Sequence, residues 1–158
     1  MGASRGNRDF LGLVSFGTFL VAVGSLFAFI PNLVDRLREF ITDFELLEIS
    51  QGIYLPVVRG PHPEVYSFLL WLGIAMAVTN AIILVARFTI RDSVRRRADT
   101  LSGIIFWTGI AILADQLSRQ NLEFQAVYSY LIIIAGISIL SSGIGLLLAK
   151  RASRSHSG

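Results

Sequence analysis

Cysteine is absent from this chain, and lysine and histidine are scarce. Without a thiol, a disulfide framework and thiolate metal or redox sites are excluded. The only lysine, Lys150, lies at the end of an apolar run, which excludes a Schiff-base lysine in the middle of a membrane. His62 and His156 both lie outside the apolar runs, and this disfavours paired haem ligation inside a membrane. We therefore expect no cofactor and no metal site.

Charged residues are also few, at 16% of the 158 residues, whereas 53% are hydrophobic. A water-soluble domain of this length needs more polar surface, but a lipid bilayer accepts an apolar exterior. The chain has no glycine-rich phosphate loop, no HExxH motif and no nucleophile elbow. The sequence therefore predicts an integral membrane protein that is not an enzyme, with the lipid bilayer as a partner and no nucleic acid partner.

Four apolar stretches follow one another at about 10–30, 65–87, 99–117 and 127–149. A helix needs about 20 apolar residues to cross the hydrocarbon core of a bilayer. The third stretch has the shortest uncharged run, so we expect its helix to begin near Asp99 and to continue to the end of the stretch. The first stretch follows a basic start, as a secretory signal core does, but its length favours a retained membrane span.

The segment 31–64 separates the first two stretches and is too polar to cross a membrane. Pro31 cannot donate a helical hydrogen bond, so the first helix is expected to end there, and Asn32 is a favourable N-cap for the next helix. Apolar residues then recur at helical spacing as far as Leu47, which predicts an amphipathic helix of about sixteen residues. We expect this helix to lie along the outer membrane surface or to pack over the membrane helices. After it, residues 53–58 favour a short extended segment.

The distribution of arginine predicts the orientation in the membrane. Ten of the 14 basic residues lie in the N-terminus, in the 87–99 loop and in the C-terminal tail. The positive-inside rule therefore predicts cytoplasmic N- and C-termini for a multi-pass protein, and we expect the plasma membrane to hold it. The tail, 151–158, is basic and rich in serine, and we expect it to be flexible.

Two of the stretches are near copies of each other. Val65–Arg87 and Val127–Lys150 both begin with Val-Tyr-Ser and an aromatic residue, stay apolar, and end on alanine and a base. Both would return from the outside to the cytoplasm, so the copies share one orientation. The predicted fold class is all-α, an integral membrane four-helix bundle built as two tandem helical hairpins by parallel duplication, with an outer amphipathic interfacial helix.

Asn80, beside Thr79, is the most polar site deep within a span, and Ser141 and Ser142 occupy the equivalent positions in the copy. A buried amide needs a hydrogen-bond partner in hydrocarbon. Two interpretations stay open. Either an interhelical hydrogen bond holds the helices together, or a two-fold polar patch contacts a transported solute or ion.

Charged residues near the ends of the spans give two further candidates. Asp115 precedes Arg119 by one helical turn, which predicts either an ion pair at the interface or a proton or cation relay. Arg95, Arg96 and Arg97 either serve only to fix the topology or contact anionic lipid head groups.

Two regular patterns have a simpler structural account. Asp35, Glu39 and Asp43 lie four residues apart and form either a solvated helix face or a divalent cation site, although they lack the ligand spacing of a calcium loop. Small residues also recur at four-residue spacing, which lets helix backbones approach closely. They are Gly24 and Ala28, Gly73, Ala77 and Ala81, Ser138 and Ser142, and Ser141 and Gly145. The pattern favours packing, with a pore lining as the alternative.

Few buried ionisable groups and an elaborated outer segment favour a non-catalytic interaction or accessory subunit of a membrane complex. The alternative is an oligomeric channel or transporter for small solutes or ions, because four helices alone enclose little space. The expected partners are other membrane-protein subunits or further copies of the same chain.

Overall fold

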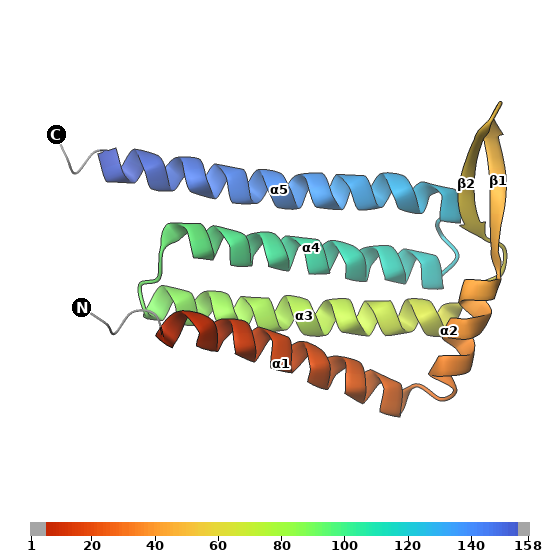
Figure 1. Ribbon diagram of the computed structural model, residues 1–158, viewed down its shortest axis with the longest axis horizontal. Helices are drawn as coiled ribbons and strands as arrows, with labels where there is room; N and C mark the ends of the chain where they lie inside the picture. The colour runs from red at the N-terminus through yellow and green to blue at the C-terminus, as the bar shows by residue number, and fades with distance from the viewer. Residues whose placement is uncertain (1–5, 155–158) are drawn as a thin grey trace.

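A computed structural model describes residues 6–154 of the chain, with side chains described at position 10 and at positions 12–147. It contains five helices and one two-stranded antiparallel sheet (Figure 1). In chain order the elements are α1 (Gly6–Phe29), α2 (Leu33–Thr42), β1 (Phe44–Ser50), β2 (Ile53–Val58), α3 (Pro63–Thr89), α4 (Val94–Ser118) and α5 (Phe124–Arg154). The start of the expected flexible tail thus continues α5, and residues 155–158 lie outside the described part of the chain.

Four of the helices, α1, α3, α4 and α5, are long and apolar enough to cross a membrane. At 1.5 Å per residue, even the 24 residues of α1 reach about 36 Å, which exceeds the hydrocarbon core of a bilayer. Each helix exposes large apolar side chains, such as Val21, Ile82, Ile112 and Ile139, that need lipid rather than water around them. The four membrane-length helices are therefore confirmed, and the chain has the architecture of a multi-pass membrane protein.

Helix α1 ends just before Pro31, as the sequence predicts. Pro31 has no N–H to donate, and just before it the Ile30 N–H donates to the Leu26 carbonyl oxygen at 3.0 Å. Asn32 then adopts a left-handed conformation (φ 55°), which asparagine tolerates better than most residues. Asn32 occupies the predicted N-cap position of α2, but its side chain makes no capping hydrogen bond.

The expectation of an all-α chain is wrong at residues 44–58, where β1 and β2 form a hairpin. The amphipathic helix α2 ends at Thr42, whose hydroxyl donates to carbonyl oxygens of its own last turn. Gly52 adopts φ 77° in the tight turn between the strands, a conformation that favours glycine. The apolar residues after Thr42 fit helical spacing, but they fit a strand equally well, and pairing with β2 decides between the two. The expected extended segment is confirmed as β2.

The start of α4 also differs from the prediction. The helix begins at Val94, five residues before Asp99. Ser93 precedes it with an extended backbone, and Arg91 takes a left-handed conformation (φ 51°) in the turn after α3. The hydropathy pattern hides this start because the first turn of α4 is charged. The run Arg95–Arg97 consequently lies on a helix and not in a loop.

The four membrane helices lie side by side in the order α1, α3, α4, α5 (Figure 1). Helix α3 packs against α1 and α4, and α4 also packs against α5. The centre of this row is the better buried part, since 28% of the apolar stretch is buried in α3 and in α4, against 6% in α5 and none in α1. The edge helices therefore keep most of their apolar surface for lipid or for another chain. The closed bundle and the duplicated hairpins stay predictions.

Small residues set the spacing within the row. A Cβ atom on Gly73 would lie 3.0 Å from the Ala111 Cβ and from the Trp107 carbonyl oxygen, and Gly145 abuts Ala98. The predicted close approach is therefore confirmed between α3 and α4 and between α4 and α5. Gly24 of α1 has no such neighbour within 4 Å, so it makes no close helix contact within the described part of the chain.

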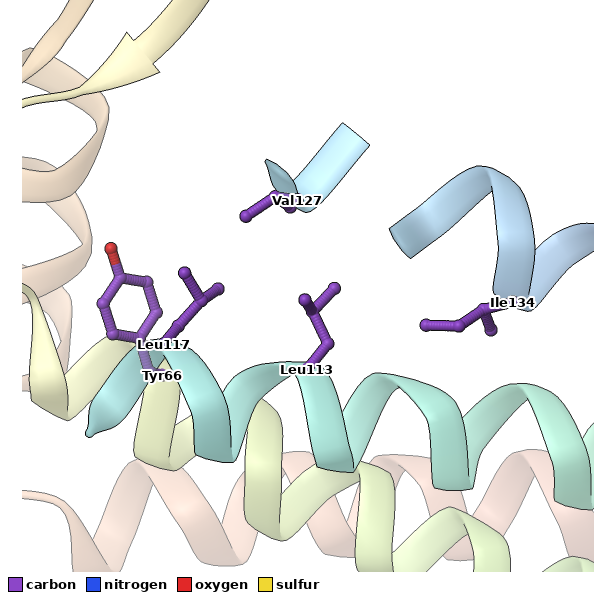
Figure 2. Close-up of a cluster of buried hydrophobic side chains, with 5 residues drawn as sticks. All are labelled: Tyr66, Leu113, Leu117, Val127 and Ile134. Atoms are coloured by element: carbon purple, nitrogen blue, oxygen red, sulfur yellow. The ribbon is translucent and has the colours of Figure 1, made fainter. Parts of the chain in front are cut away.

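The two ends of the row have different characters. At the capped end, α2 and the β-hairpin cross the ends of the membrane helices, whereas the α3–α4 turn and the end of α5 form the basic end (Figure 1). The main cluster of buried apolar side chains lies toward the capped end, between α3, α4 and α5 (Figure 2). Its members are Tyr66, Leu113, Leu117, Val127 and Ile134.

Candidate functional site

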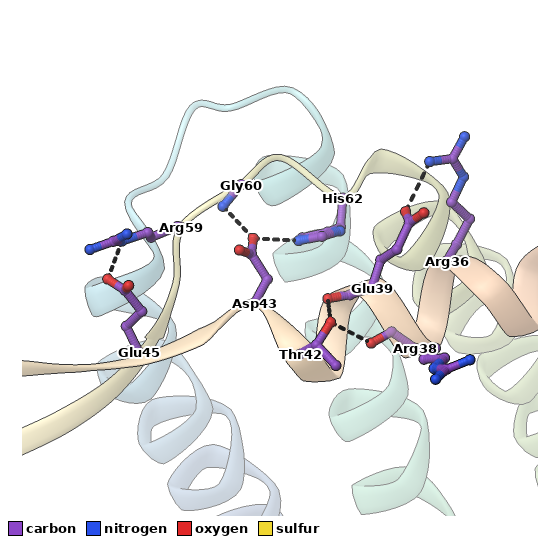
Figure 3. A network of polar contacts seen from close by, with 9 residues as sticks. All are labelled: Arg36, Arg38, Glu39, Thr42, Asp43, Glu45, Arg59, Gly60 and His62. Carbon is purple, nitrogen blue, oxygen red and sulfur yellow. Dashed lines mark hydrogen bonds and ion pairs between the residues drawn. The ribbon is translucent and has the colours of Figure 1, made fainter.

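We call α2 and the β-hairpin together the cap, and Asp43 fixes this cap beside the start of α3 (Figure 3). Its Oδ2 atom accepts the Gly60 N–H at 2.8 Å and lies 2.9 Å from Nε2 of His62. The His62 side chain is only 12% exposed, and its ring stands edge-on to Phe40 with the centroids 5.3 Å apart. The hydrogen bond with His62, and then the one from Gly60, lower the pKa of the Asp43 carboxyl below its ordinary value. A carboxylate thus joins the end of α2 to the β2–α3 connection.

Further contacts hold the base of the hairpin. Arg59 pairs with Glu45, and the two residues flank the strands close to Asp43 (Figure 3). Tyr128 of α5 donates its hydroxyl proton to the carbonyl oxygen of Pro56 in β2. An exposed ion pair contributes little by itself, but the Tyr128 hydrogen bond joins the hairpin to a membrane helix. The base of the hairpin is therefore attached to both α3 and α5.

Apolar side chains cover the rest of the hairpin, and the membrane helices leave them exposed. Leu46 is 71% exposed, Ile49 50%, Ile53 56% and Tyr54 54%, and we call these four residues the hairpin surface. A two-stranded hairpin is marginally stable alone, and its unpaired strand edges favour pairing with another chain. The hairpin crosses the row beside the start of α5 (Figure 1). This arrangement is an anchored apolar surface at the boundary of the membrane.

Thr79 and Asn80 are satisfied largely within their own helix. The Thr79 hydroxyl donates to the Ala75 carbonyl oxygen at 2.7 Å, and the Asn80 amide donates to the Met76 carbonyl oxygen at 2.8 Å. The Asn80 side chain also lies against α4, because a Cβ atom on Gly103 would come within 3.1 Å of Asn80 Oδ1. Asn80 therefore packs at the α3–α4 contact, and its amide donor stays within α3.

Ser141 and Ser142 belong to α5, which packs against α4. Ser141 donates to the Ser138 carbonyl oxygen at 2.8 Å, and Ser142 donates to Oδ1 of Asp99 in α4 at 2.7 Å. No hydrogen bond joins these serines to Asn80 among the described residues. Interhelical hydrogen bonds, one of the two interpretations of Asn80, are made instead by Ser142 and by Ser102, which donates to the Ser138 carbonyl oxygen at 2.6 Å.

The charged candidates occupy both ends of the row. Arg119 Nε lies 2.9 and 3.0 Å from the two carboxylate oxygens of Asp115, so the predicted ion pair is present. At the basic end, Arg95 is exposed and Arg96 pairs with Asp92 at 3.4 Å.

Arg97 differs from the two arginines before it. Its guanidinium carbon lies 4.6 Å from the centroid of the Phe88 ring. Arg97 also lines a cavity between α3, α4 and α5. Arg97 is therefore a predicted head-group contact that combines an aromatic neighbour with a cavity.

The acidic residues of α2 and its end do not form one cluster. Glu39 lies 3.0 Å from Arg36, and Asp43 is engaged by His62. In residues 6–154, no group of three or more His, Cys, Asp or Glu side chains is arranged to hold a metal ion.

Comparison of the chain with models of known protein families, with characterised proteins and with solved structures finds no match. The functional argument therefore depends on the geometry of this chain. The strongest geometric feature is the anchored hairpin surface at the capped end.

Sequence reasoning missed the contacts that anchor the cap. Asp43 meets His62 across 19 residues, and Tyr128 meets Pro56 across 72 residues. Local patterns report on neighbours within a few residues, so neither pairing has a signal in the sequence. The one available hint was that Asp43 and His62 both lie in the segment between two membrane helices.

Proposed function

We propose that this chain is a non-catalytic accessory subunit of a membrane protein complex and that it docks on its partner through the hairpin surface. The observation that carries the proposal is an apolar surface that is exposed although its base is firmly attached. A hairpin that served only to cover its own helices would turn these side chains inward. Aromatic and aliphatic anchors on a rigid element are typical of protein interfaces.

The proposed orientation puts the termini and the basic end in the cytoplasm of a plasma-membrane protein, and the cap outside. It is supported by the five arginines between positions 87 and 97 and by Lys150, Arg151 and Arg154 at the end of α5. An external cap would meet the extracytoplasmic part of a partner, or the partner's helix ends at the membrane surface.

We also propose that the membrane part arose by duplication of a helical hairpin. Support comes from burial, because three pairs of residues that lie 62 positions apart are buried in both α3 and α5, and both helices pack against α4. The pairs are Val65 and Val127, Leu72 and Ile134, and Met76 and Ser138. Closure of the row into a bundle would then be completed by a partner against α1 or α5.

The alternative function, an oligomeric channel or transporter, needs polar side chains on a common wall. The Asn80 amide donates within α3, and the Ser142 hydroxyl donates to Asp99. Asp115 is paired with Arg119 at a helix end. We therefore favour the accessory subunit. Flux through proteoliposomes that is lost in Asn80→Ala and Asp115→Asn would favour transport instead.

Purification from native membranes in mild detergent tests the proposal. We expect a mass above that of the monomer and a co-purifying membrane protein in a fixed ratio. Leu46→Asp is expected to release that partner, because the added charge would be buried in the interface. Ser50→Asp adds the same charge at an exposed polar position of the hairpin and is expected to retain it. The proposal would be contradicted if the unmodified protein and the Ser50→Asp variant were both stable monomers without a partner.

A further inference from the structure

A cavity of about 350 Å³ opens at the basic end, between the end of α3, the beginning of α4 and the second half of α5. Its walls are mainly apolar and include Leu84 and Phe88 of α3, Leu101 of α4 and Ile144 of α5. Among the described side chains, Arg97 is the charged one that lines it. The cavity thus combines an apolar wall with the positive charge of Arg97 at the end of the membrane row.

The Arg97 guanidinium is held in place by an aromatic ring and forms no ion pair with the described residues. It lies over the Phe88 ring, a contact that favours a cation and fixes the plane of the group. Its Nε atom is buried and has no hydrogen-bond partner among the described residues. The terminal nitrogens of the same guanidinium are the donors that can meet a ligand in the cavity, and a phosphate oxygen would form a charge-assisted hydrogen bond with them.

The two acidic residues between positions 87 and 101 are engaged elsewhere. Asp92 pairs with Arg96 at 3.4 Å, and Asp99 accepts the Ser142 hydroxyl at 2.7 Å. Neither carboxylate pairs with Arg97 among the described residues, and the Arg97 side chain lines the cavity instead. The charge at this site is therefore complementary to an anion that comes from outside.

We propose that this cavity binds one anionic phospholipid, with the phosphate on Arg97 and one acyl chain along Leu101 and Ile144. Five arginines and only two aspartates lie between positions 87 and 99, and a basic segment at a membrane surface attracts anionic head groups. A free phosphate would use the charge but not the apolar wall, whereas a helix of another protein would use the wall but leave Arg97 unpaired. The proposal depends on the membrane location of the chain and not on the accessory function.

Native mass spectrometry of the full-length protein in detergent tests this, with phosphatidylglycerol as the anionic lipid and phosphatidylcholine as the zwitterionic comparison. We expect one tightly retained phosphatidylglycerol. Arg97→Ala is expected to weaken its binding about tenfold or more, because a charge-assisted hydrogen bond is lost. Arg95→Ala removes the same charge from an exposed position and is expected to change the affinity by less than about twofold.

A second variant separates the wall from the charge. Ile144→Trp fills the cavity without changing any charge, and we expect it to expel the lipid while circular dichroism shows unchanged helix content. Equal binding of both lipids, or equal losses in Arg95→Ala and Arg97→Ala, would overturn the proposal. Displacement of the lipid by glycerol phosphate, which has no acyl chain, would also overturn it. So would a dimer that Ile144→Trp dissociates, because the cavity would then belong to a second copy.

Discussion

Helices α3 and α5 both carry the Val-Tyr-Ser motif near their start and both pack against α4, but their surroundings differ. Helix α3 has α1 on a further side, and the α2 end of the cap packs against it. Helix α5 stands at the edge of the row and contacts β2 of the hairpin. The neighbours of each helix therefore decide how much of its apolar surface is left open, with 28% of the apolar stretch buried in α3 and 6% in α5.

The two equivalent tyrosines show the same contrast on a smaller scale. Tyr66 of α3 is 5% exposed and lies inside the core cluster, edge-on to Phe40 at 6.3 Å between centroids. Tyr128 of α5 is half-buried and instead donates to Pro56 of the hairpin. One copy of the motif thus builds the core, and the other holds the proposed docking element. The comparison implies that α5 and the hairpin form the side of the molecule that is open to another chain.

The largest expected effect is a difference in the free energy of unfolding between variants of these two tyrosines. Tyr66→Ala is expected to destabilise the protein by about 3–5 kcal/mol, because truncation leaves a cavity among packed side chains. Tyr128→Ala is expected to cost less, about 1–2 kcal/mol, because a hydrogen bond and a partly exposed ring are lost. Chemical unfolding in detergent, followed by circular dichroism, measures both. Equal losses would show that the two helices are packed alike.

A second prediction compares glycines on the two helices. Gly73→Leu places a side chain against the Ala111 backbone of α4 and is expected to cost about 1–3 kcal/mol through overpacking. Gly136 of α5 has open space around it, so Gly136→Leu is expected to stay within about 0.5 kcal/mol. The same unfolding measurement applies. A large loss in Gly136→Leu would reveal a neighbour against that face of α5.

A third and smaller effect concerns the attachment of the hairpin to α5. Tyr128→Phe removes only the hydroxyl that donates to Pro56 and is expected to cost about 0.5–1.5 kcal/mol. Hydrogen exchange is expected to quicken in β1 and β2 but not in α4. Unchanged exchange in the hairpin would mean that the contacts on the α3 side are sufficient to hold it.

The smallest effect is expected from pH at the α3 side of the cap. The pKa of Asp43 lies below its ordinary value of 3.8 in the folded protein, chiefly because of the hydrogen bond with His62. The carboxylate therefore stabilises the folded cap above that pH, and this stabilisation is lost as the pH falls through the lowered pKa. We expect the Gly60 amide to lose protection from exchange in that range.

Asp43→Asn removes the titrating group and should abolish this pH dependence. Asp35 is exposed in the same helix, so Asp35→Asn is the matched control and should leave the dependence unchanged. The same loss of Gly60 protection in Asp43→Asn as in the unmodified protein would assign the effect to another group.

Much of the fold is predictable because hydropathy and proline act locally. The four membrane-length helices and the end of α1 before Pro31 follow from runs of apolar residues and from one missing donor. The Asp115 and Arg119 pair was predictable for the same reason, since both lie on one helix a single turn apart.

The remaining features depend on contacts between distant residues. The hairpin forms because β1 pairs with β2, beginning at Phe44 and Val58. The spacing of apolar residues within one short segment does not show whether the segment will be a helix or a strand. The early start of α4 is obscured by its charged first turn, which also concealed the bond between Asp99 and Ser142. The surroundings of the candidate polar residues were not predictable either, because they depend on which helices pack together. Asn80 packs against Gly103 of α4, and Ser142 donates to Asp99 of the same helix.

Photo-crosslinking in native membranes tests the central claim that the hairpin surface docks on a protein. A crosslinking side chain at Leu46 is expected to give one discrete protein adduct. The same group at Ile82, an exposed position on α3 that lies within the membrane, is expected to give lipid adducts. Lipid adducts alone at both positions would contradict the account, because the hairpin would then lie against the bilayer and have no protein partner.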